Sequence, residues 1–256
     1  VRLLLDMKEK KRLPHLSSQV GDHVRTNNEN LSMVLTSKKD FDFSRGIAIG
    51  SIFPPDENGH VEPVRYGEGS GFWKIFGAPM IFGNTFGNRA GQLLKYLFTH
   101  PVRWFRVYFT KDFSKRSVIL LFMQHLDSTI KFKRGLFSLK STMSTGPKPT
   151  PFMPMAKRLA GEMEKVIDGN SFMISTDILT GAPSTAHILG GAVIGENPEK
   201  GVIDVDQKVF GYQNMYVCDG SAVSANPGVN PSLSITAMTE RAMSKIPEKK
   251  DIKGLF

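Results

Sequence analysis

The sequence predicts a mixed fold of the α+β or α/β class, in which an antiparallel sheet is combined with helices. Segments that alternate apolar and polar residues, separated by turn signals, indicate antiparallel strands in the first half of the chain. Segments with apolar residues at helical spacing follow near residues 154–167 and 232–246. With 256 residues, 40% of them hydrophobic and 22% charged, the chain is long enough for one large domain or two ordinary ones.

The first elements are expected to be a helix end and two strands. Residues 2–13 have the pattern of an amphipathic helix end, and the polar run from Arg25 to Asn30 is interpreted as a loop or the edge of a site. Residues 41–53 and 61–66 alternate as strands do, and the intervening Pro54-Pro55-Asp56-Glu57-Asn58-Gly59 is a strong turn signal. These segments are therefore predicted to be two antiparallel strands.

Residues 67–91 are rich in glycine and aromatic residues without a clear period, which favours a mobile covering loop. Further along, residues 117–122 and 130–133 are strand candidates separated by a polar stretch. A helix is predicted for residues 154–167, with a core-facing set at helical spacing that comprises Met155, Leu159, Met163 and Val166.

Basic and aromatic residues alternate between Gly91 and Arg116, and two interpretations of this segment stay open. Such a mixture is typical of a segment that contacts a membrane surface. Alternatively, two helices broken at Pro101 pack their aromatic rings inward and expose their cations. The basic residues are Lys95, Arg103, Arg106, Lys111, Lys115 and Arg116, and the aromatic ones are Tyr96, Phe98, Trp104, Phe105, Tyr108 and Phe109.

Charge and composition exclude several classes of protein. The net charge of +9 is spread over basic residues interleaved with acidic ones, so no nucleic-acid partner is expected. The longest apolar run, residues 118–123, is far shorter than the roughly 20 residues that cross a bilayer. The lone cysteine, Cys218, is expected to be a small core residue, and no metal site is predicted. Because the chain opens on Val1 with the pattern of a helix interior, we expect it to begin partway through a larger protein.

The last quarter of the chain gathers residues suited to chemistry. Asn230 is a good N-cap and Pro231 suits the first helical position, so a helix is predicted from there to Ile246. Its first turn has free N–H groups that stabilise an anionic ligand, such as a reduced flavin. Upstream, residues 215–218 are expected to form a short buried strand that delivers the turn Asp219-Gly220-Ser221.

His187 precedes Asn230 by 43 residues (230 − 187) and lies beside Gly190-Gly191, whose missing side chains would admit a planar ligand. A lone histidine near glycines is more often structural, and only its pairing with the predicted helix start favours a functional role. If the two residues meet, one can take up the proton of a substrate hydroxyl while the other holds its oxygen.

These motifs resemble a known family. The segments Thr185-Ala186-His187-Ile188-Leu189-Gly190-Gly191, Tyr216-Val217-Cys218-Asp219-Gly220-Ser221 and Gly228-Val229-Asn230-Pro231-Ser232-Leu233 look like the C-terminal signature of the glucose-methanol-choline (GMC) flavin oxidoreductases. Within the family, the likeness is greatest to bacterial cholesterol oxidases. The resemblance implies an FAD-dependent alcohol oxidase with a sterol or bulky alcohol as substrate and O2 as electron acceptor. It implies that His187 and Asn230 are the catalytic pair, and that FAD is contacted by Asp219, Gly220, Asn230, Pro231 and Ser232.

The resemblance also implies a domain arrangement. Residues 1–30 would be a remnant of the FAD-binding domain, residues 31–185 a substrate-binding domain with an antiparallel sheet, and residues 186–256 the C-terminal portion of a Rossmann-like FAD-binding domain. Members of this family hold the ADP part of FAD with a strand, a Gly-x-Gly-x-x-Gly turn and a helix, and this unit is absent from the sequence. We therefore expect an N-terminal FAD-binding half to be missing and the fragment alone to be inactive.

Glu62 is the candidate for a further catalytic base. Some cholesterol oxidases shift a ring double bond after oxidation, which needs a carboxylate with a raised pKa in an apolar cavity. Alternation in His60-Val61-Glu62-Pro63 places His60 and Glu62 on one face, whereas a surface pair of Glu62 with Arg65 is an equally simple interpretation. Two other functions stay open: a dehydrogenase for another bulky or long-chain alcohol, and a sterol-binding or membrane-surface module without turnover.

Overall fold

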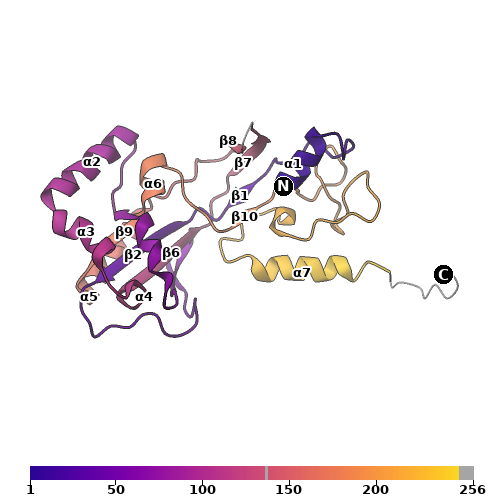
Figure 1. Ribbon diagram of the computed structural model, residues 1–256. Helices are drawn as coiled ribbons and strands as arrows, with labels where there is room; N and C mark the ends of the chain where they lie inside the picture. Colours follow the sequence, from indigo (N-terminus) through magenta and orange to yellow (C-terminus); the bar gives the residue numbers. More distant parts are fainter. Residues whose placement is uncertain (136–137, 248–256) are drawn as a thin grey trace. The chain divides into compact units, whose positions relative to one another are not determined.

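The computed structural model describes residues 1–135 and 138–247, and these form two compact units (Figure 1). Unit 1 consists of residues 1–26, residues 127–147 and the chain from His187 onward. Unit 2 consists of Asn27–Leu126 and Lys148–Ala186. The chain therefore passes from one unit to the other at 26/27, 126/127, 147/148 and 186/187. Both units mix helices with antiparallel strands, as predicted from the sequence.

Unit 2 is built on a six-stranded sheet with the order β3-β4-β6-β2-β9-β5, in which every neighbouring pair is antiparallel. The central strand β2 pairs Met33 with Ile119 of β6 on one side and with Phe172 of β9 on the other. The six strands are β2 (Asn30–Thr36), β3 (Phe53–Asp56), β4 (Gly59–Val64), β5 (Gly77–Pro79), β6 (Ser117–Gln124) and β9 (Gly169–Ile174).

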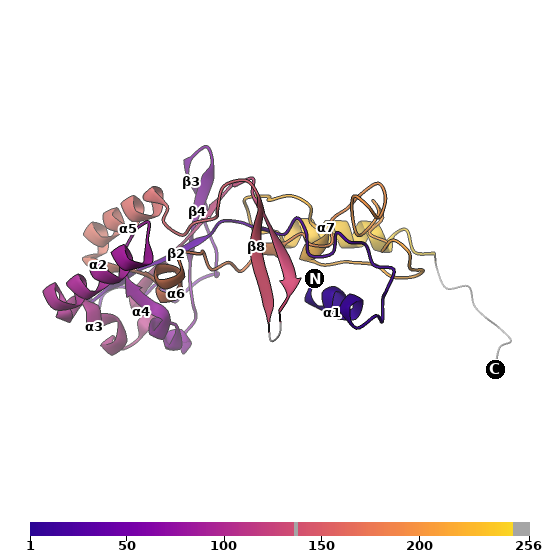
Figure 2. The same cartoon turned by 90° about the horizontal axis from the view of Figure 1, so that it is seen from above.

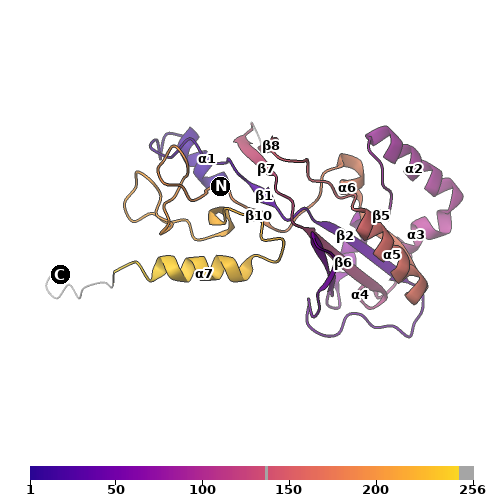
Figure 3. The same cartoon turned by 180° about the vertical axis from the view of Figure 1, so that it is seen from behind.

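Both faces of this sheet are covered by helices, which explains why its central strands are buried along most of their length. Val34 packs with α5 (Pro154–Ile167) on one face. Its neighbours Met33 and Leu35 point to the other face and pack with α3 (Pro101–Phe109) and α4 (Phe113–Arg116). Figure 2 shows α5 on one side of β2 with α3 and α4 on the other, and Figure 3 shows α5 lying along β2.

The segment between β4 and β6 is more regular than the sequence suggested. Residues 67–91 were predicted to be a mobile loop, but they contain the 3-10 helix η1 (Ser70–Phe76), the edge strand β5 and the start of α2 (Phe86–Thr99). The threonine cap of α2 is well formed, since Thr85 Oγ1 accepts a hydrogen bond from the Asn88 amide at 3.2 Å. The sequence of this segment shows no hydrophobic period because its elements are short. They are held in place by tertiary contacts with β9 and α3.

The break at Pro101 between α2 and α3 is confirmed, but the inward packing of all aromatic rings is wrong. Val107 is buried and Tyr108 packs beside it against the sheet. By contrast, Phe98 and Phe109 are 80% and 78% exposed, and Phe105 is 45% exposed. No helix in the described residues is both long enough and apolar enough to cross a membrane.

Two further differences concern strands and one helix of unit 2. Residues 41–53 were predicted to be a strand, yet apart from Phe53, which opens β3, only an isolated bridge from Ile49 to Val64 forms there. Strand β3 instead runs through Pro54 and Pro55, which an edge strand tolerates, and Asp56 Oδ1 closes the turn by accepting the Asn58 amide at 2.9 Å.

Helix α5 has the predicted bounds and packs Met155, Leu159 and Met163 on the core. Val166 is 72% exposed, so its assignment to the core was wrong.

Unit 1 has its own core and shorter elements. Its core contains Leu4 of α1 (Arg2–Glu9) together with apolar residues of the C-terminal segment, among them Val202, Ile203 and Val217. Strand β1 (Arg25–Thr26) pairs with β10 (Ile188–Leu189), and β7 (Thr129–Arg134) pairs with β8 (Leu139–Thr145). The remaining elements are η2 (Gly220–Ala222) and α7 (Ser232–Met243). The second of the two strands expected between residues 117 and 133 thus joins β8 in unit 1, and not the six-stranded sheet.

Candidate active site

Three segments singled out in the sequence converge on Gly220 of unit 1. A Cβ atom at Gly220 would lie 3.2 Å from the Ile188 carbonyl oxygen, 3.3 Å from Leu189 Cδ2 and 3.5 Å from Ile235 Cδ1. Ile188 opens β10 directly after His187, and Ile235 lies in the first turns of α7, which follows Asn230. The fold therefore brings the segments of His187, Asp219 and Asn230 together at one glycine.

Hydrogen bonds hold this arrangement in register. The Gly190 and Ala192 amides donate to the carbonyls of Gly220 and Ser221, each at 3.0 Å. The hydroxyl of Thr239 in α7 donates to the Cys218 carbonyl at 3.2 Å, which fastens the helix to the chain that leads into the turn. Residues 215–218 do not form the short strand expected from the sequence, because only the bridge between Lys208 and Tyr216 is made there.

Asp219 shapes the turn with its side chain. Its Oδ1 atom accepts a hydrogen bond from the Ser221 amide at 2.8 Å and another from the Ser221 hydroxyl, so it caps η2. This use of the carboxylate was not foreseen from the sequence, where Asp219 was considered only as a ligand contact. The turn itself follows the Asx pattern, in which an aspartate accepts from the backbone two residues on.

Gly190 and Gly191 have a different role from the one that the sequence suggested. Both have left-handed φ values, +72° and +87°. A Cβ atom at Gly190 would collide with the carbonyl of His23, and one at Gly191 would lie 2.6 Å from a methyl of Val1 and 2.9 Å from one of Val24. Their missing side chains thus make room for the N-terminal segment of unit 1, and the idea that they admit a planar ligand is wrong.

The helix after Asn230 starts one residue later than predicted and ends earlier. Pro231 is the N-cap, with φ −86° and ψ −1°, and its carbonyl accepts the Ile235 amide at 2.9 Å. No side chain caps this end, so the first amides of α7 are left to bind other groups. Ser232 is exposed and Leu233 is 81% exposed in that first turn. The helix ends at Met243 and not at Ile246, since Ser244 has the C-cap position.

His187 and Asn230 are each half-buried, which leaves part of each side chain accessible to a ligand. Apolar side chains next to them in the chain are exposed: Ile188 by 51% and Val229 by 39%. An imidazole and an amide beside exposed apolar groups suit a substrate that has one hydroxyl on a large hydrocarbon body.

Glu62 belongs to unit 2, and the structure corrects its expected environment. The residue lies in β4, where Glu62 is 4% and His60 is 5% exposed, so the interpretation as a surface pair with Arg65 is wrong. His60 Nε2 lies 3.3 Å from Glu62 Oε1. Both side chains lie on one face of β4, as alternation predicted. A buried carboxylate with a titratable partner is the kind of group that can move a proton within an apolar site.

The polar run that was interpreted as a loop or the edge of a site is buried. Residues 27–29 lie outside any helix or strand, as a loop does, and Asn30 opens β2, but Asn27, Asn28, Glu29 and Asn30 are at most 3% exposed. Asn28 donates to Gln124 Oε1 at 2.8 Å, and Asn30 donates to the Pro151 carbonyl at 2.7 Å. The sequence held one signal of this burial: the polar residues stand directly next to an apolar strand. Polar groups buried at such a place must form hydrogen bonds with neighbouring segments.

Glu29 binds the backbone directly before His187. Its Oε2 atom accepts a hydrogen bond from the Ala186 amide at 2.8 Å, one residue before His187. A carboxylate–amide bond of this kind fixes the backbone that leads into the candidate catalytic histidine.

Cys218 lies next to the turn, and its surroundings make it a weak nucleophile. Partial burial, and secondly the negative charge of Asp219, raise the pKa of the thiol above its usual value. The thiol is therefore protonated at neutral pH and is a weak nucleophile, as expected. Its assignment to the core was wrong, because Cys218 is only partly buried.

Comparison with known proteins identifies the class to which this site belongs. Residues 130–239, which include His187, the Asp219 turn and Asn230, match the family described as GMC oxidoreductase. Residues 130–239 thus resemble the C-terminal domain of the GMC oxidoreductases.

Particular relatives extend this match to nearly the whole chain. It is 38% identical to a cholesterol oxidase of Acinetobacter baumannii over 255 residues, which is 98% of this chain and 46% of the relative. It is 41% identical to a cholesterol oxidase of Mycobacterium tuberculosis over 259 residues, 96% of this chain and 44% of the relative. The chain therefore spans less than half the length of these curated relatives.

A solved structure supports the fold. Pyridoxine 4-oxidase from Mesorbium loti matches with a TM-score of 0.50 over 90% of this chain and 44% of that chain, at 12% sequence identity. At this identity the likeness concerns the fold alone.

Proposed function

We propose that the protein takes part in the FAD-dependent oxidation of a sterol alcohol, cholesterol or a related 3-hydroxysteroid, to the ketone, with O2 as the final electron acceptor. The observation that carries the proposal is the convergence of the His187 segment, the Asp219–Gly220 turn and the uncapped start of α7 on one glycine. The identity to relatives named cholesterol oxidase supports the choice of a sterol.

The residues at this point fit a flavin. The uncapped amides of α7 supply hydrogen-bond donors and the positive end of a helix dipole, which suit a ring that gains negative charge. The exposed apolar side chains of Ile188, Val229 and Leu233 suit contact with a flat ring or a hydrocarbon substrate. We assign the cofactor contacts to Asn230, Pro231 and Ser232 at the helix start and to Gly220 in the turn, with Asp219 holding that turn in shape.

The chemistry divides between cofactor and protein. FAD, when bound, accepts the hydride that leaves the carbinol carbon. His187 takes the hydroxyl proton as the C=O bond forms, and Asn230 holds the substrate oxygen through its amide. Glu29 keeps the backbone before His187 in place through its bond to the Ala186 amide. Orientation of the hydroxyl between two fixed groups lowers the entropic cost of the reaction.

Glu62 is proposed as the base for a second step, the shift of a ring double bond toward the new ketone. Its burial beside His60 at 3.3 Å supports this role, because His60 can hold the carboxylate in one orientation. In the assay described below, Glu62→Gln should still form the ketone but no longer release the conjugated product, which is recognised by its ultraviolet absorbance. Unchanged release of conjugated ketone would remove Glu62 from the mechanism.

We further propose that an N-terminal half with the Gly-x-Gly-x-x-Gly unit completes the FAD site, and that this chain alone is inactive. The chain matches less than half of its relatives' length, which supports a longer functional protein. The exposed apolar residues of α7, with Leu233 at 81% and Met243 at 45%, are suitable for coverage by such a half.

The test is anaerobic mixing of the full-length protein with cholesterol while flavin absorbance is followed. Wild type should bleach, and His187→Ala and Asn230→Ala should each slow bleaching by about a hundredfold or more, the usual contribution of a positioned acid–base group. His125→Ala and Asn84→Ala, at exposed positions of unit 2, are the matched controls and should bleach normally.

Two outcomes distinguish the alternatives. If wild type bleaches only with other bulky or long-chain alcohols and forms no peroxide in air, the protein is a dehydrogenase for such a substrate. If no sterol or long-chain alcohol bleaches the flavin, the redox proposal fails and a sterol-binding or membrane-surface module without turnover is left.

A further inference from the structure

Helices α2 and α3 of unit 2 present an apolar strip to solvent. Its members recur every three or four residues, which places them on one side of each helix. Their exposed fractions range from 45% for Phe105 to 80% for Phe98. The strip consists of Leu94, Phe98, Val102, Phe105 and Phe109.

The opposite side of the same helices already supplies the contacts that hold them to the sheet. Leu93 and Tyr96 of α2 pack on the cluster around Ala78 and Met173, and Val107 of α3 is buried in the cluster around Phe172. The apolar strip is therefore additional to what the fold of unit 2 needs. Exposed apolar groups in such a contiguous set mark an interaction surface.

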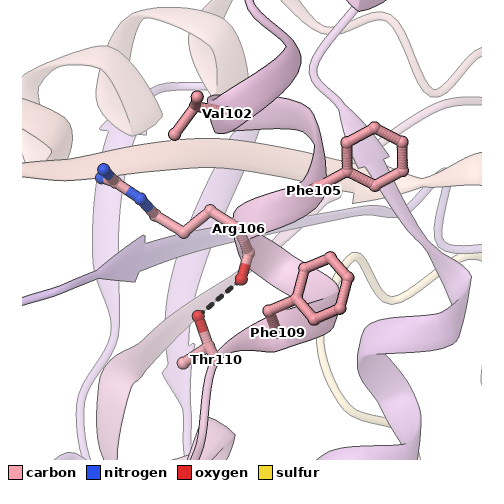
Figure 4. A pocket seen from close by; sticks show the side chains of 5 residues that line it. All are labelled: Val102, Phe105, Arg106, Phe109 and Thr110. Carbon is pink, nitrogen blue, oxygen red and sulfur yellow. Dashed lines mark hydrogen bonds between the residues drawn. The ribbon is translucent and has the colours of Figure 1, made fainter.

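The strip has a shallow hollow rather than a deep binding pocket. Figure 4 shows Val102, Phe105 and Phe109 along α3, with the Arg106 side chain extending on the side of Val102 and the two phenyl rings on the other side. These residues and Thr110 line a hollow of about 320 Å³, and the Thr110 hydroxyl donates to the Arg106 carbonyl at 2.7 Å. A lining of three apolar side chains and one guanidinium suits an acyl chain with an anionic group beside it.

A second apolar group adjoins the strip. Helix η1 contacts α3 and exposes Phe72, Ile75 and Phe76 by 55%, 66% and 44%. The strip and the exposed residues of η1 together form an apolar surface that is larger than the strip alone.

Basic residues predominate around the strip, although Glu68 and Asp112 line a hollow that also includes Phe109 at its end. Between Gly69 and Lys111 the sequence contains no aspartate or glutamate. The same stretch contains six basic residues, of which Arg89 is 5% exposed and donates to backbone carbonyls. The other five are Lys74, Lys95, Arg103, Arg106 and Lys111. Cations beside exposed aromatic rings are complementary to anionic lipid headgroups above a hydrocarbon layer.

We propose that the apolar strip of α2 and α3 docks unit 2 onto an anionic membrane surface, with its rings in the headgroup boundary and its flanking cations on the lipid phosphates and carboxylates. The helices have 14 and 9 residues, too few to span a bilayer, so they lie along the interface. A second copy of the chain is a poorer occupant, because a symmetric contact would bring like-charged surfaces together. The inference is independent of the proposed oxidation, since docking requires neither flavin nor turnover.

The test is vesicle flotation of the purified chain, with phosphatidylcholine vesicles compared with phosphatidylcholine and phosphatidylserine at about two to one. Wild type should float with the anionic vesicles, and binding should weaken at high salt. Phe98→Ser with Phe109→Ser, and separately Arg103→Glu with Lys111→Glu, should each reduce binding by about tenfold or more. All four side chains are exposed, so circular dichroism should show unchanged folding.

Val166→Ser is the matched control, because Val166 is 72% exposed but lies on α5, which covers the other face of the sheet. It should leave flotation unchanged. Equal binding of wild type and both double variants, or no binding of wild type, would overturn the proposal. Loss of a wild-type dimer in the Phe98→Ser and Phe109→Ser variant, without vesicle binding by wild type, would assign the strip to a second copy instead.

Discussion

Burial raises the pKa of two side chains to which the fold gives different degrees of exposure, Cys218 beside the candidate site and Asp177 in unit 2. Cys218 and Asp177 both have pKa values raised by burial, yet one is left half-exposed and the other is 1% exposed. Asp177 in α6 (Ser175–Thr180) accepts hydrogen bonds from the Ser184 amide at 3.0 Å and the Ser184 hydroxyl at 2.6 Å. These bonds oppose the effect of burial on its pKa without cancelling it.

Asp177→Asn should stabilise the protein at neutral pH, because it retains an acceptor for Ser184 and removes a buried charge. The folded-state pKa of Asp177 lies above its ordinary value of 3.8, so the fold favours the protonated acid. Wild type therefore loses stability as the pH rises from about 4 through that folded pKa, and the neutral amide does not. The advantage of the variant, of up to a few degrees in Tm, should grow over this window and then become constant.

The measurement is thermal unfolding at a series of pH values. Asp168→Asn, at an exposed left-handed position that asparagine also tolerates, is the control and should show no such growth. A lower Tm for Asp177→Asn at neutral pH would mean that the charge itself is stabilising.

Glycines in or next to helices and strands differ in whether the structure requires them. At some positions only glycine fits the backbone, and at others a side chain would fit. Gly190, directly after β10, has a left-handed φ and lies against the His23 carbonyl. Gly161 lies inside α5, and a Cβ atom added there would meet nothing within 4 Å. Substitution by alanine should therefore act in opposite directions at the two positions.

Gly190→Ala should destabilise the protein by at least about 2 kcal/mol, whereas Gly161→Ala should stabilise it by up to about 1 kcal/mol through helix propensity. Urea unfolding of both variants measures the difference. A neutral effect of Gly190→Ala would show that the turn between β10 and η2 can relax, and would weaken the argument that Gly220 unites the site.

Elements with strong periods were predictable, and those held by tertiary contacts were not. Helix α5 and the break at Pro101 follow from spacing and proline alone. Strand β3 was placed too early, because its prolines were interpreted as a turn signal when the strand lies at a sheet edge. The run at residues 27–30 was interpreted as a loop or the edge of a site, but its burial was not predicted, since polarity in a sequence does not reveal that the partners lie near residues 124, 150 and 186.

The candidate site was proposed from the sequence only through the order and spacing of its residues. His187, Asp219 and Asn230 were each ambiguous alone, and the convergence at Gly220 depends on packing that no local pattern contains. The prediction that Gly190 and Gly191 admit a planar ligand was wrong because it, too, depended on packing. Their close neighbours come from residues 1, 23 and 24, which are far away in the sequence.

The whole molecule consists of two units with separate cores, and unit 2 should fold by itself. Its core clusters draw on β2, β4, β6, β9 and α5, all within Asn27–Leu126 and Lys148–Ala186. The hairpin β7–β8 that interrupts it has neighbouring ends, since Thr129 and Thr145 share a hydrogen bond of 2.7 Å. A short glycine linker in place of residues 127–147 should therefore be able to join the two segments of unit 2, Asn27–Leu126 and Lys148–Ala186.

Residues 27–186 with this replacement should unfold cooperatively on heating, as measured by circular dichroism and calorimetry. The same segment with Phe122→Ala, which removes a side chain that is 2% exposed, is the comparison and should be less stable by about 3 kcal/mol. A broad transition without a heat-absorption peak would show that the core of unit 2 depends on unit 1.

The return of the β7–β8 hairpin to unit 1 has a genetic consequence. Because the chain crosses between units at four places, neither unit corresponds to one uninterrupted stretch of the gene. A single recombination breakpoint therefore cannot exchange either unit between relatives without carrying pieces of the other.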